Sequence, residues 1–203
     1  NLAKKNVLKI NKKKKFKIPY VFPSFFLNTF IVKAFNYLYY LINSRKKKDF
    51  IVNYDQFFYP LDSLIDWNKI YGPKGFAQFQ CVIPIENAKC GMRELLNSIS
   101  KSGTAAFLAV LKRFGNENSF FSFPMEGYSL ALDFPINNKS LKLMHQLDAI
   151  TLKYKGRFYL TKDSRMKKET FQNSEKRFKE FVKFRSVNKL NSFTSSQSER
   201  LGL

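Results

Sequence analysis

The middle of the chain repeats two patterns of apolar and polar positions. Residues 78–83 begin with alternating polar and apolar side chains and stop at Pro84, as a strand does, and residues 86–101 place apolar side chains at helical spacing up to Gly103. Similar patterns predict strands over 105–114, 128–134 and 157–160 and a helix over 141–155. The order strand, helix, strand, strand, helix, strand predicts an α+β fold, with an antiparallel sheet covered by helices on one face.

The two ends of the chain follow other patterns. Residues 22–42 are apolar and aromatic but contain Lys33, which favours an amphipathic surface or lid helix over a transmembrane span. Residues 192–203 are polar and predict a frayed C-terminus. Between these ends, four phenylalanines recur at helical spacing and predict packing contacts: Phe171, Phe178, Phe181 and Phe184.

The charge is strongly positive and uneven. The net charge is +21, and residues 1–50 hold 13 of the 36 Lys and Arg but a single acid, Asp49. Such runs indicate an anionic membrane surface or a biased base composition that also aids solubility, and nucleic acid is the least favoured partner. The expected location is cytoplasmic or peripheral to a membrane. Cys81 and Cys90 lack metal-ligand spacing, so two free thiols and no metal site are expected.

Four segments resemble one enzyme family in the same order along the chain. They are residues 67–84, 107–115, 122–135 and 158–165, the last reading Phe-Tyr-Leu-Thr-Lys-Asp-Ser-Arg. Together they resemble the flavin-linked sugar oxidases, in the branch that oxidises the 2′-hydroxyl of decaprenylphosphoryl-β-D-ribose. The resemblance extends from about residue 56 to residue 171 and implies the C-terminal half of such an enzyme. Its cofactor would be FAD, bound mainly by a domain preceding residue 1.

The resemblance also implies roles for individual residues. Lys162 would be the catalytic residue, facing both flavin and substrate, with Tyr159 beside the flavin. Gln78 and Gln80, two residues apart and so on one strand face, would bind sugar hydroxyls. Without the resemblance, these would be read as a surface lysine and a solvated sheet face. The other implied pocket residues are Phe58, Trp67, Leu108, Val110, Lys112, Phe114, Ser129 and Ala131. His145, the sole histidine, matches no catalytic position and is expected at the surface.

Three departures from the family pattern bear on the substrate. Ser129 and Ala131 stand where well-known members of the branch have Asn and Cys, which widens the pocket and removes its thiol. Phe58 replaces a tyrosine and loses one hydroxyl. The His-Trp-Gly type of motif found in sugar-lactone oxidases of the same superfamily is absent from the sequence, which argues against that activity.

These observations predict a three-part organisation and one favoured function. Residues 1–50 would form a basic lid or membrane-surface segment, 51–156 the substrate-binding domain, and 157–203 a segment returning to the FAD-binding domain. The implied reaction oxidises a secondary hydroxyl of a polyprenyl-phosphate-linked pentose during 2′-epimerisation for cell-envelope glycans. An NAD-dependent epimerase-type reductase would be its partner, and residues 1–203 alone would be inactive. The alternatives are a sugar-1,4-lactone or other alcohol oxidase and a non-catalytic membrane-surface or nucleic-acid binding protein.

Overall fold

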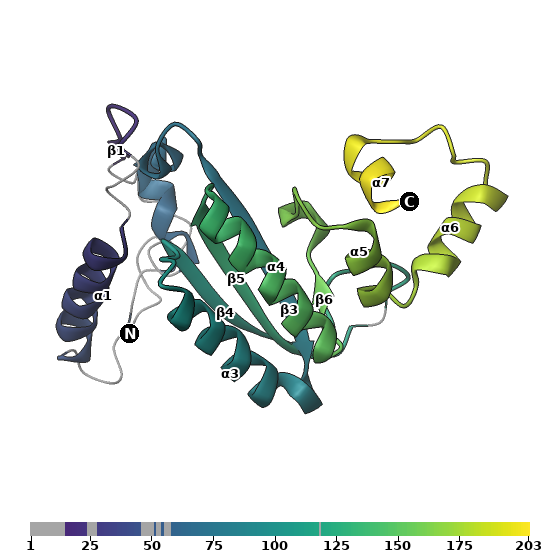
Figure 1. The fold of residues 1–203 in the computed structure, drawn as a ribbon, viewed down its shortest axis with the longest axis horizontal. Helices are drawn as coiled ribbons and strands as arrows, with labels where there is room; N and C mark the ends of the chain where they lie inside the picture. Colours follow the sequence, from purple (N-terminus) through teal and green to yellow (C-terminus); the bar gives the residue numbers. More distant parts are fainter. Residues whose placement is uncertain (1–14, 24–27, 46–50, 52–53, 55–57, 118) are drawn as a thin grey trace, which may run out of the picture.

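A four-stranded antiparallel sheet forms the centre of the molecule. The computed structural model describes residues 15–23, 28–45, 51, 54, 58–117 and 119–203 (Figure 1). The strands lie in the order β4-β5-β3-β6. Each adjacent pair is antiparallel, so the predicted α+β class is confirmed. The bounds are β3 Phe76–Pro84, β4 Leu108–Phe114, β5 Gly127–Pro135 and β6 Arg157–Phe158.

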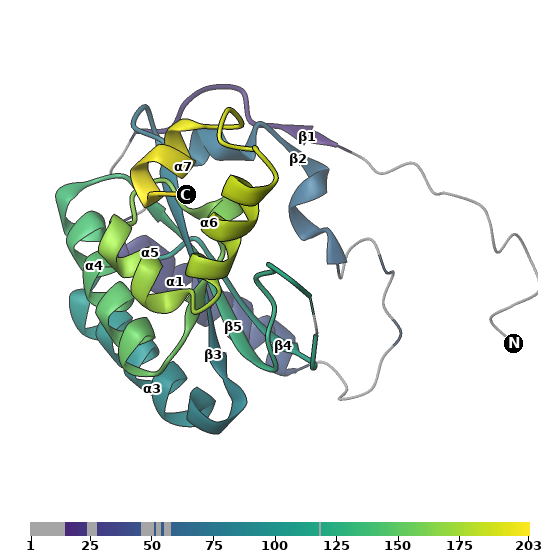
Figure 2. The same ribbon diagram turned by 90° about the vertical axis from the view of Figure 1, so that its right-hand side faces the viewer.

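Two helices cover one face of this sheet. They are α3 Ile85–Ser102 and α4 Asn138–Lys153, which run side by side in both ribbon views (Figures 1 and 2). Alternate side chains of β3 and β5, such as Phe79 and Leu132, meet helix residues such as Leu95 and Leu147 in one buried cluster. Each such side chain contributes about 1.5–3 kcal/mol through burial. The predicted covering of one face by helices is therefore confirmed.

After α4 the chain turns back to the sheet, and its backbone passes very close to β3. Lys155 adopts a left-handed conformation (φ 56°), and Gly156 follows it. A Cβ on Gly156 would lie 2.8 Å from the carbonyl oxygen of Val82 and 2.7 Å from side-chain atoms of Ile83 and Thr151. Glycine is therefore required there for β6 to dock beside β3. The predicted strand over 157–160 is shortened to β6, because the chain then turns into the 3-10 helix η4 Leu160–Lys162.

The C-terminal residues are ordered, and the prediction of a frayed end over 192–203 is wrong. Helix α7 Ser196–Leu201 begins with a capping box between Ser195 and Ser198. Its Leu201 is 0% exposed and belongs to the same buried cluster as Phe171 of helix α5 Lys168–Ser174. The serine-rich composition suggested disorder, but two of these serines cap the helix and Leu201 packs it against the core.

The four phenylalanines lie on two helices. Helix α5 ends at Ser174, and helix α6 Phe178–Val187 follows after Glu175 and Arg177, which pair at 2.7 Å. Phe171 meets Phe178 edge to face across this break, with ring centroids 5.8 Å apart. Phe181 stacks on Phe121 of the β4–β5 connection at 4.3 Å. These three phenylalanines therefore pack, as predicted from their spacing.

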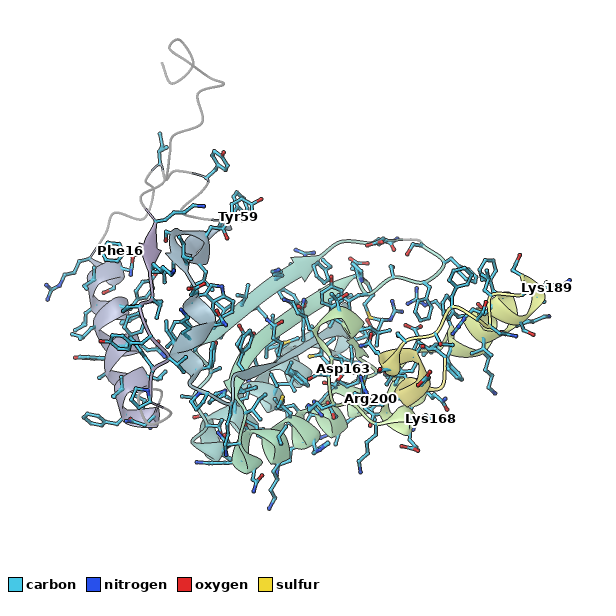
Figure 3. The ribbon with its side chains drawn as sticks, turned by 90° about the horizontal axis from the view of Figure 1, so that it is seen from above. Phe16, Tyr59, Asp163, Lys168, Lys189 and Arg200 are labelled. Carbon is cyan, nitrogen blue, oxygen red and sulfur yellow. The ribbon has the colours of Figure 1, made fainter. Side chains whose placement is uncertain are left out.

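The N-terminal elements lie at the end of the molecule opposite to α7, as Figures 1 and 3 show. Strands β1 Phe16–Lys17 and β2 Leu64–Ile65 form a small parallel pair. The 3-10 helices η2 Pro60–Ser63 and η3 Trp67–Tyr71 lead into β3. Helix α1 Thr29–Ser44 leaves most of its aromatic side chains exposed, Phe30 by 80%. Within the described ranges, helices with the length and apolarity needed to cross a membrane are absent.

Candidate active site

The face of the sheet turned away from α3 and α4 collects most of the predicted pocket residues. Strand alternation and the register place Gln80 opposite Ala131, Ala131 opposite Val110, and Ser129 opposite Lys112. These positions are out of phase with the core side chains, so they share the other face, which we call the open face. The predicted residues that the structure brings together there are Gln78, Gln80, Leu108, Val110, Lys112, Phe114, Ser129 and Ala131.

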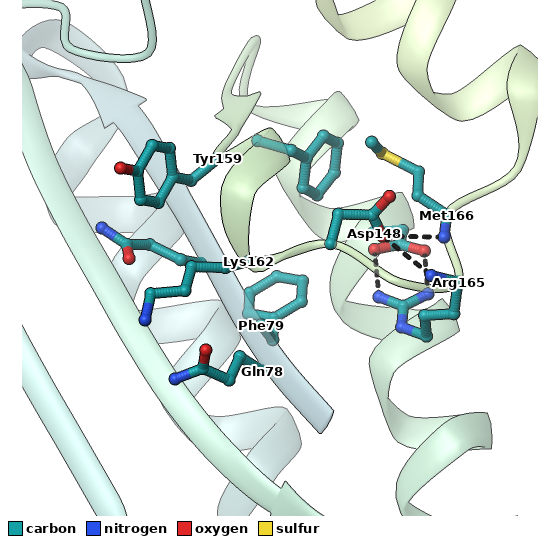
Figure 4. A pocket seen from close by; sticks show the side chains of 10 residues that line it. Gln78, Phe79, Asp148, Tyr159, Lys162, Arg165 and Met166 are labelled. Carbon is teal, nitrogen blue, oxygen red and sulfur yellow. Dashed lines mark hydrogen bonds and ion pairs between the residues drawn. The ribbon is translucent and has the colours of Figure 1, made fainter. Parts of the chain in front are cut away.

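Lys162 reaches the same region from the other side of β3. The backbone N–H of Tyr159 donates to the carbonyl of Gln80 at 3.0 Å, which continues the pairing of β6 with β3. The chain then turns through η4, and Lys162 lies at its end. Lys162, Tyr159, Gln78 and Gln80 line one small pocket, with the labelled side chains of Lys162, Tyr159 and Gln78 on one side of it (Figure 4). The structure therefore groups the predicted catalytic lysine with both predicted amides.

The loop that carries Lys162 is fixed by two ion pairs. Arg165 makes a bidentate pair with Asp148 of α4, at 2.7 and 2.8 Å (Figure 4). Asp163 pairs with Arg200 of α7 at 2.8 Å and accepts a hydrogen bond from the backbone N–H of Met166 at 2.8 Å (Figure 3). Because α4 and α7 hold both sides of the loop, Lys162 is presented from a rigid support.

Asp133 is a site residue that sequence reasoning missed. It lies on β5 in phase with Ser129 and Ala131 and is 2% exposed. Its Oδ1 accepts a hydrogen bond from Nε2 of Gln78 at 2.9 Å. Burial raises the pKa of Asp133, while the Gln78 hydrogen bond and the positive charge of Lys162 oppose the rise. The available signal was a carboxylate at an alternate position of an apolar strand.

Aromatic side chains form one wall beside the open face. Phe123, from the β4–β5 connection, meets Phe114 edge to face at 5.8 Å and stacks on Tyr159 at 4.7 Å. The connection is tied down because Arg157 and Arg177 both donate to the carbonyl of Ser122, at 2.8 and 2.6 Å. Phe123 thus links two predicted residues, Phe114 and Tyr159, and was not itself singled out from the sequence.

Two predicted pocket residues lie outside this group. Trp67 is on η3 and packs against Phe76, at the beginning of β3, with ring centroids 5.2 Å apart. Phe58 lies in the segment before η2, is 67% exposed and contacts Tyr59 at 6.4 Å. Trp67 is therefore at the rim of the open face, whereas the structure does not place Phe58 on it.

The remaining chemistry-bearing side chains lie away from the open face. His145 is on the exposed side of α4, beside the Arg165–Asp148 pair. Cys81 is buried between sheet and helices, and Cys90 is exposed on α3, both as free thiols. Groups of three or more potential metal ligands are absent from the part of the chain that the structure describes. The grouping around Lys162 is thus the best candidate for chemistry.

The fold is an α+β domain whose open face gathers two amides, a lysine and a buried carboxylate, and comparison with known proteins shows what the chain is similar to. The chain is 34% identical over 201 residues, 98% of its length, to a decaprenylphosphoryl-β-D-ribose oxidase of Mycolicibacterium smegmatis. The resemblance seen in the motifs is therefore confirmed, and it is consistent with the C-terminal half of that oxidase.

A second relative is more distant. The chain is 29% identical over 133 residues, 64% of its length, to an uncharacterised protein from the mprA 5′ region of Streptomyces coelicolor. The chain spans 43% and 36% of the lengths of these two relatives. No family model matches the sequence. The comparisons do not favour the sugar-lactone oxidase or the non-catalytic binding protein.

Proposed function

We propose that this chain is the substrate-binding part, with its closing C-terminal segment, of an FAD-dependent oxidoreductase. Its substrate would be a polyprenyl-phosphate-linked pentose, whose secondary hydroxyl is oxidised to a ketone. The observation that carries the proposal is the grouping of Lys162, Gln78, Gln80 and Tyr159 at the open face, in a chain similar to an oxidase of that substrate class. A keto product of this kind requires a reductase to complete an epimerisation, which is the partner predicted from the sequence.

The side chains fit the two tasks that such a reaction leaves to the protein. The amides of Gln78 and Gln80 suit sugar hydroxyls, because each amide offers both a donor and an acceptor. Lys162 provides a positive charge that stabilises negative charge developing on the substrate oxygen or on the cofactor. FAD, when bound, supplies the acceptor for the hydride.

The open face also fits a planar cofactor supplied by another part of the protein. Helices α3 and α4 cover the opposite face, so a second domain would close over the open face beside Lys162 and Tyr159. Tyr159 already stacks on Phe123, which gives it a fixed ring plane beside the lysine. These two residues would contact the cofactor, and the aromatic wall would exclude water from the reacting atoms.

The test uses the full-length protein that contains residues 1–203. Purified protein should carry flavin absorbance that bleaches when polyprenyl-phosphate ribose is added without an electron acceptor. The Lys162→Ala variant should keep its flavin but bleach at least about 100-fold more slowly, because a preorganised charge at the reacting atoms is lost. Lys142→Ala, an exposed lysine on α4, is the matched control and should behave as wild type.

Two outcomes would contradict the proposal at different levels. Absence of flavin, or bleaching by sugar lactones but not by the lipid-linked pentose, would overturn the proposed cofactor or substrate. Equal bleaching by wild type and Lys162→Ala would remove Lys162 from the reaction while leaving the oxidase assignment intact.

A further inference from the structure

The open face contains a buried carboxylate that the proposed reaction does not yet use. Asp133 is almost fully removed from solvent, and its Oδ2 has no hydrogen-bond partner among the residues that the structure describes. An ionised carboxylate in such a place costs stability unless neighbouring groups compensate it. Asparagine or leucine at position 133 would destabilise the fold less than a buried carboxylate does. The carboxylate therefore points to a role beyond packing.

The first neighbour of Asp133 is Gln78, and their contact fixes the direction of the Gln78 amide. An ionised carboxylate accepts hydrogen bonds and cannot donate them. In the structure Nε2 of Gln78 donates to Oδ1 of Asp133 at 2.9 Å, which leaves Oε1 of Gln78 to accept from a ligand. Gln78 lines the pocket with Lys162, so a ligand meets an acceptor from Gln78 next to a donor from Lys162.

The second neighbour is Lys162, which approaches from η4. Lys162 lines the same pocket as Gln78. Burial raises the pKa of Asp133, and the positive charge of Lys162 opposes this rise less than the Gln78 hydrogen bond does. Tyr71 of η3 is a second titratable group close enough to interact with Asp133, and burial together with the Asp133 carboxylate raises the pKa of Tyr71. Tyr71 therefore stays neutral, and Lys162 is the cation that the buried charge attracts toward Gln78.

We propose that Asp133 is a positioning residue of this site, acting through Gln78 and Lys162. It turns the Gln78 carbonyl toward the ligand and holds the Lys162 ammonium beside it. The resulting acceptor and donor recognise two oxygen atoms of one sugar, a hydroxyl that donates to Gln78 Oε1 and a neighbouring oxygen that accepts from Lys162 Nζ. The inference rests on the proposed function and specifies how the pentose is selected.

The test compares Asp133→Asn with wild type in the full-length flavoprotein, using substrate-driven flavin bleaching. Asparagine has nearly the same shape but can present either an oxygen or an NH₂ group to Gln78, so the amide is no longer held in one direction. KM for the lipid-linked pentose should rise about tenfold or more, because the loss of one hydrogen bond to a charged group weakens binding by about that factor. The effect on kcat should be smaller. Glu117→Gln, an exposed change on the β4–β5 connection, is the control.

Two further readouts separate positioning from a merely structural role. Protonation of Asp133 in wild type should weaken substrate binding as pH falls through its raised pKa, and this acid limb should be missing in Asp133→Asn. In a Gln78→Ala background, Asp133→Asn should add little further loss, because both act through the same amide.

The outcomes distinguish the inference from the function on which it rests. If wild type carries no flavin or is not bleached, the proposed function fails. If wild type is bleached but Asp133→Asn keeps the wild-type KM and acid limb, or adds its full loss in the Gln78→Ala background, the role of Asp133 is overturned.

Discussion

At the scale of single residues, the open face lacks a thiol. Ala131 and Ser129, the two departures from the family pattern described above, both lie on the open face. Cys81 is opposite Leu130 in the register and is directed to the helix-covered face instead, where burial raises the pKa of its thiol to about 12. Cys90 is exposed on α3. The two thiols therefore differ greatly in reactivity.

We predict that, of the two cysteines in residues 1–203, thiol-directed reagents modify only Cys90 in the folded protein. A covalent electrophile aimed at the sugar pocket should leave every peptide of the open face unmodified. Peptide mapping by mass spectrometry after maleimide treatment checks this. In Cys90→Ser, the peptides of residues 1–203 should stay unlabelled until denaturant exposes Cys81. Modification near residue 131, or of Cys81 in native protein, would show that the strand positions are wrongly assigned.

Asp133 is a second informative residue, because its ionised carboxylate lowers the stability of the fold while it is expected to strengthen substrate binding. Burial raises its pKa, so the folded state binds a proton more tightly than the unfolded state. The charged form destabilises the fold, and this cost grows as pH rises through the unfolded and then the folded pKa. Asp133→Asn should therefore keep or raise the melting temperature at neutral pH while weakening substrate binding.

At the scale of elements, the last helix supports the segment that carries Lys162, although it lies far from that segment in the sequence. Helix α7 contributes Arg200 to Asp163, and Gln197 donates to the carbonyls of Leu160 and Asp163 at 2.7 and 3.1 Å. Its Leu201 is buried in the common core. The position of η4, and with it Lys162, therefore depends on a helix more than thirty residues further along the chain.

Loss of the α7 anchor should weaken both the fold and the site. Leu201→Ala should lower the free energy of unfolding by about 2–5 kcal/mol, the usual cost of emptying a buried leucine site. Val187→Ala, at an exposed position of α6, should change it by less than about 0.5 kcal/mol. Urea unfolding followed by tryptophan fluorescence measures both. A neutral effect of Leu201→Ala would mean that α7 is not part of the cooperative fold.

The features of the fold and site that could be predicted from the sequence are those set by interactions between residues close together in the chain. Strands β3 and β5 and helices α3 and α4 were predicted within a few residues, because their patterns are local and their ends are marked by Pro84, Gly103 and similar residues. The gathering of Lys162 with Gln78 was implied by the resemblance rather than by periodicity. Helix α7, the pairing of Arg165 with Asp148 and the contact of Asp133 with Gln78 join distant residues, and single-sequence patterns do not report such contacts.

At the scale of the whole molecule, helix α1 combines exposed aromatic side chains with a strongly basic surrounding sequence. Between residues 15 and 45 the sequence contains Lys15, Lys17, Lys33 and Arg45 and no acidic residue. Aromatic side chains favour the interface of a bilayer, and clustered lysines and arginines favour anionic lipids. We propose an anionic bilayer surface as the partner of α1, which would bring the protein to a lipid-linked substrate.

If α1 binds an anionic bilayer, the binding of the protein to vesicles should depend on the salt concentration. Wild-type protein should co-sediment with vesicles containing phosphatidylglycerol, bind neutral vesicles weakly, and lose binding as salt is raised. A variant with Phe30, Tyr37 and Tyr40 changed to serine should bind several-fold less, whereas Phe193→Ser, an equally exposed change near the C-terminus, should bind normally. Equal binding by both variants, or self-association through α1 without vesicle binding, would reject the bilayer as the partner.

The core positions lie on one face of the sheet and the candidate binding positions on the other, which has a practical consequence for redesign. Core side chains and open-face side chains alternate along β3 and β5, so each of these two strands carries two sets of positions. A combinatorial library confined to the open-face set can be screened for new sugar preferences, because those positions lie opposite the side chains that pack under α3 and α4. A single-residue insertion in β3 or β5 would instead exchange the two sets and abolish both properties at once. Substitutions should therefore be accessible routes to new specificity, and insertions in these strands should not; the set to vary is Gln78, Gln80, Val110, Lys112, Ser129 and Ala131.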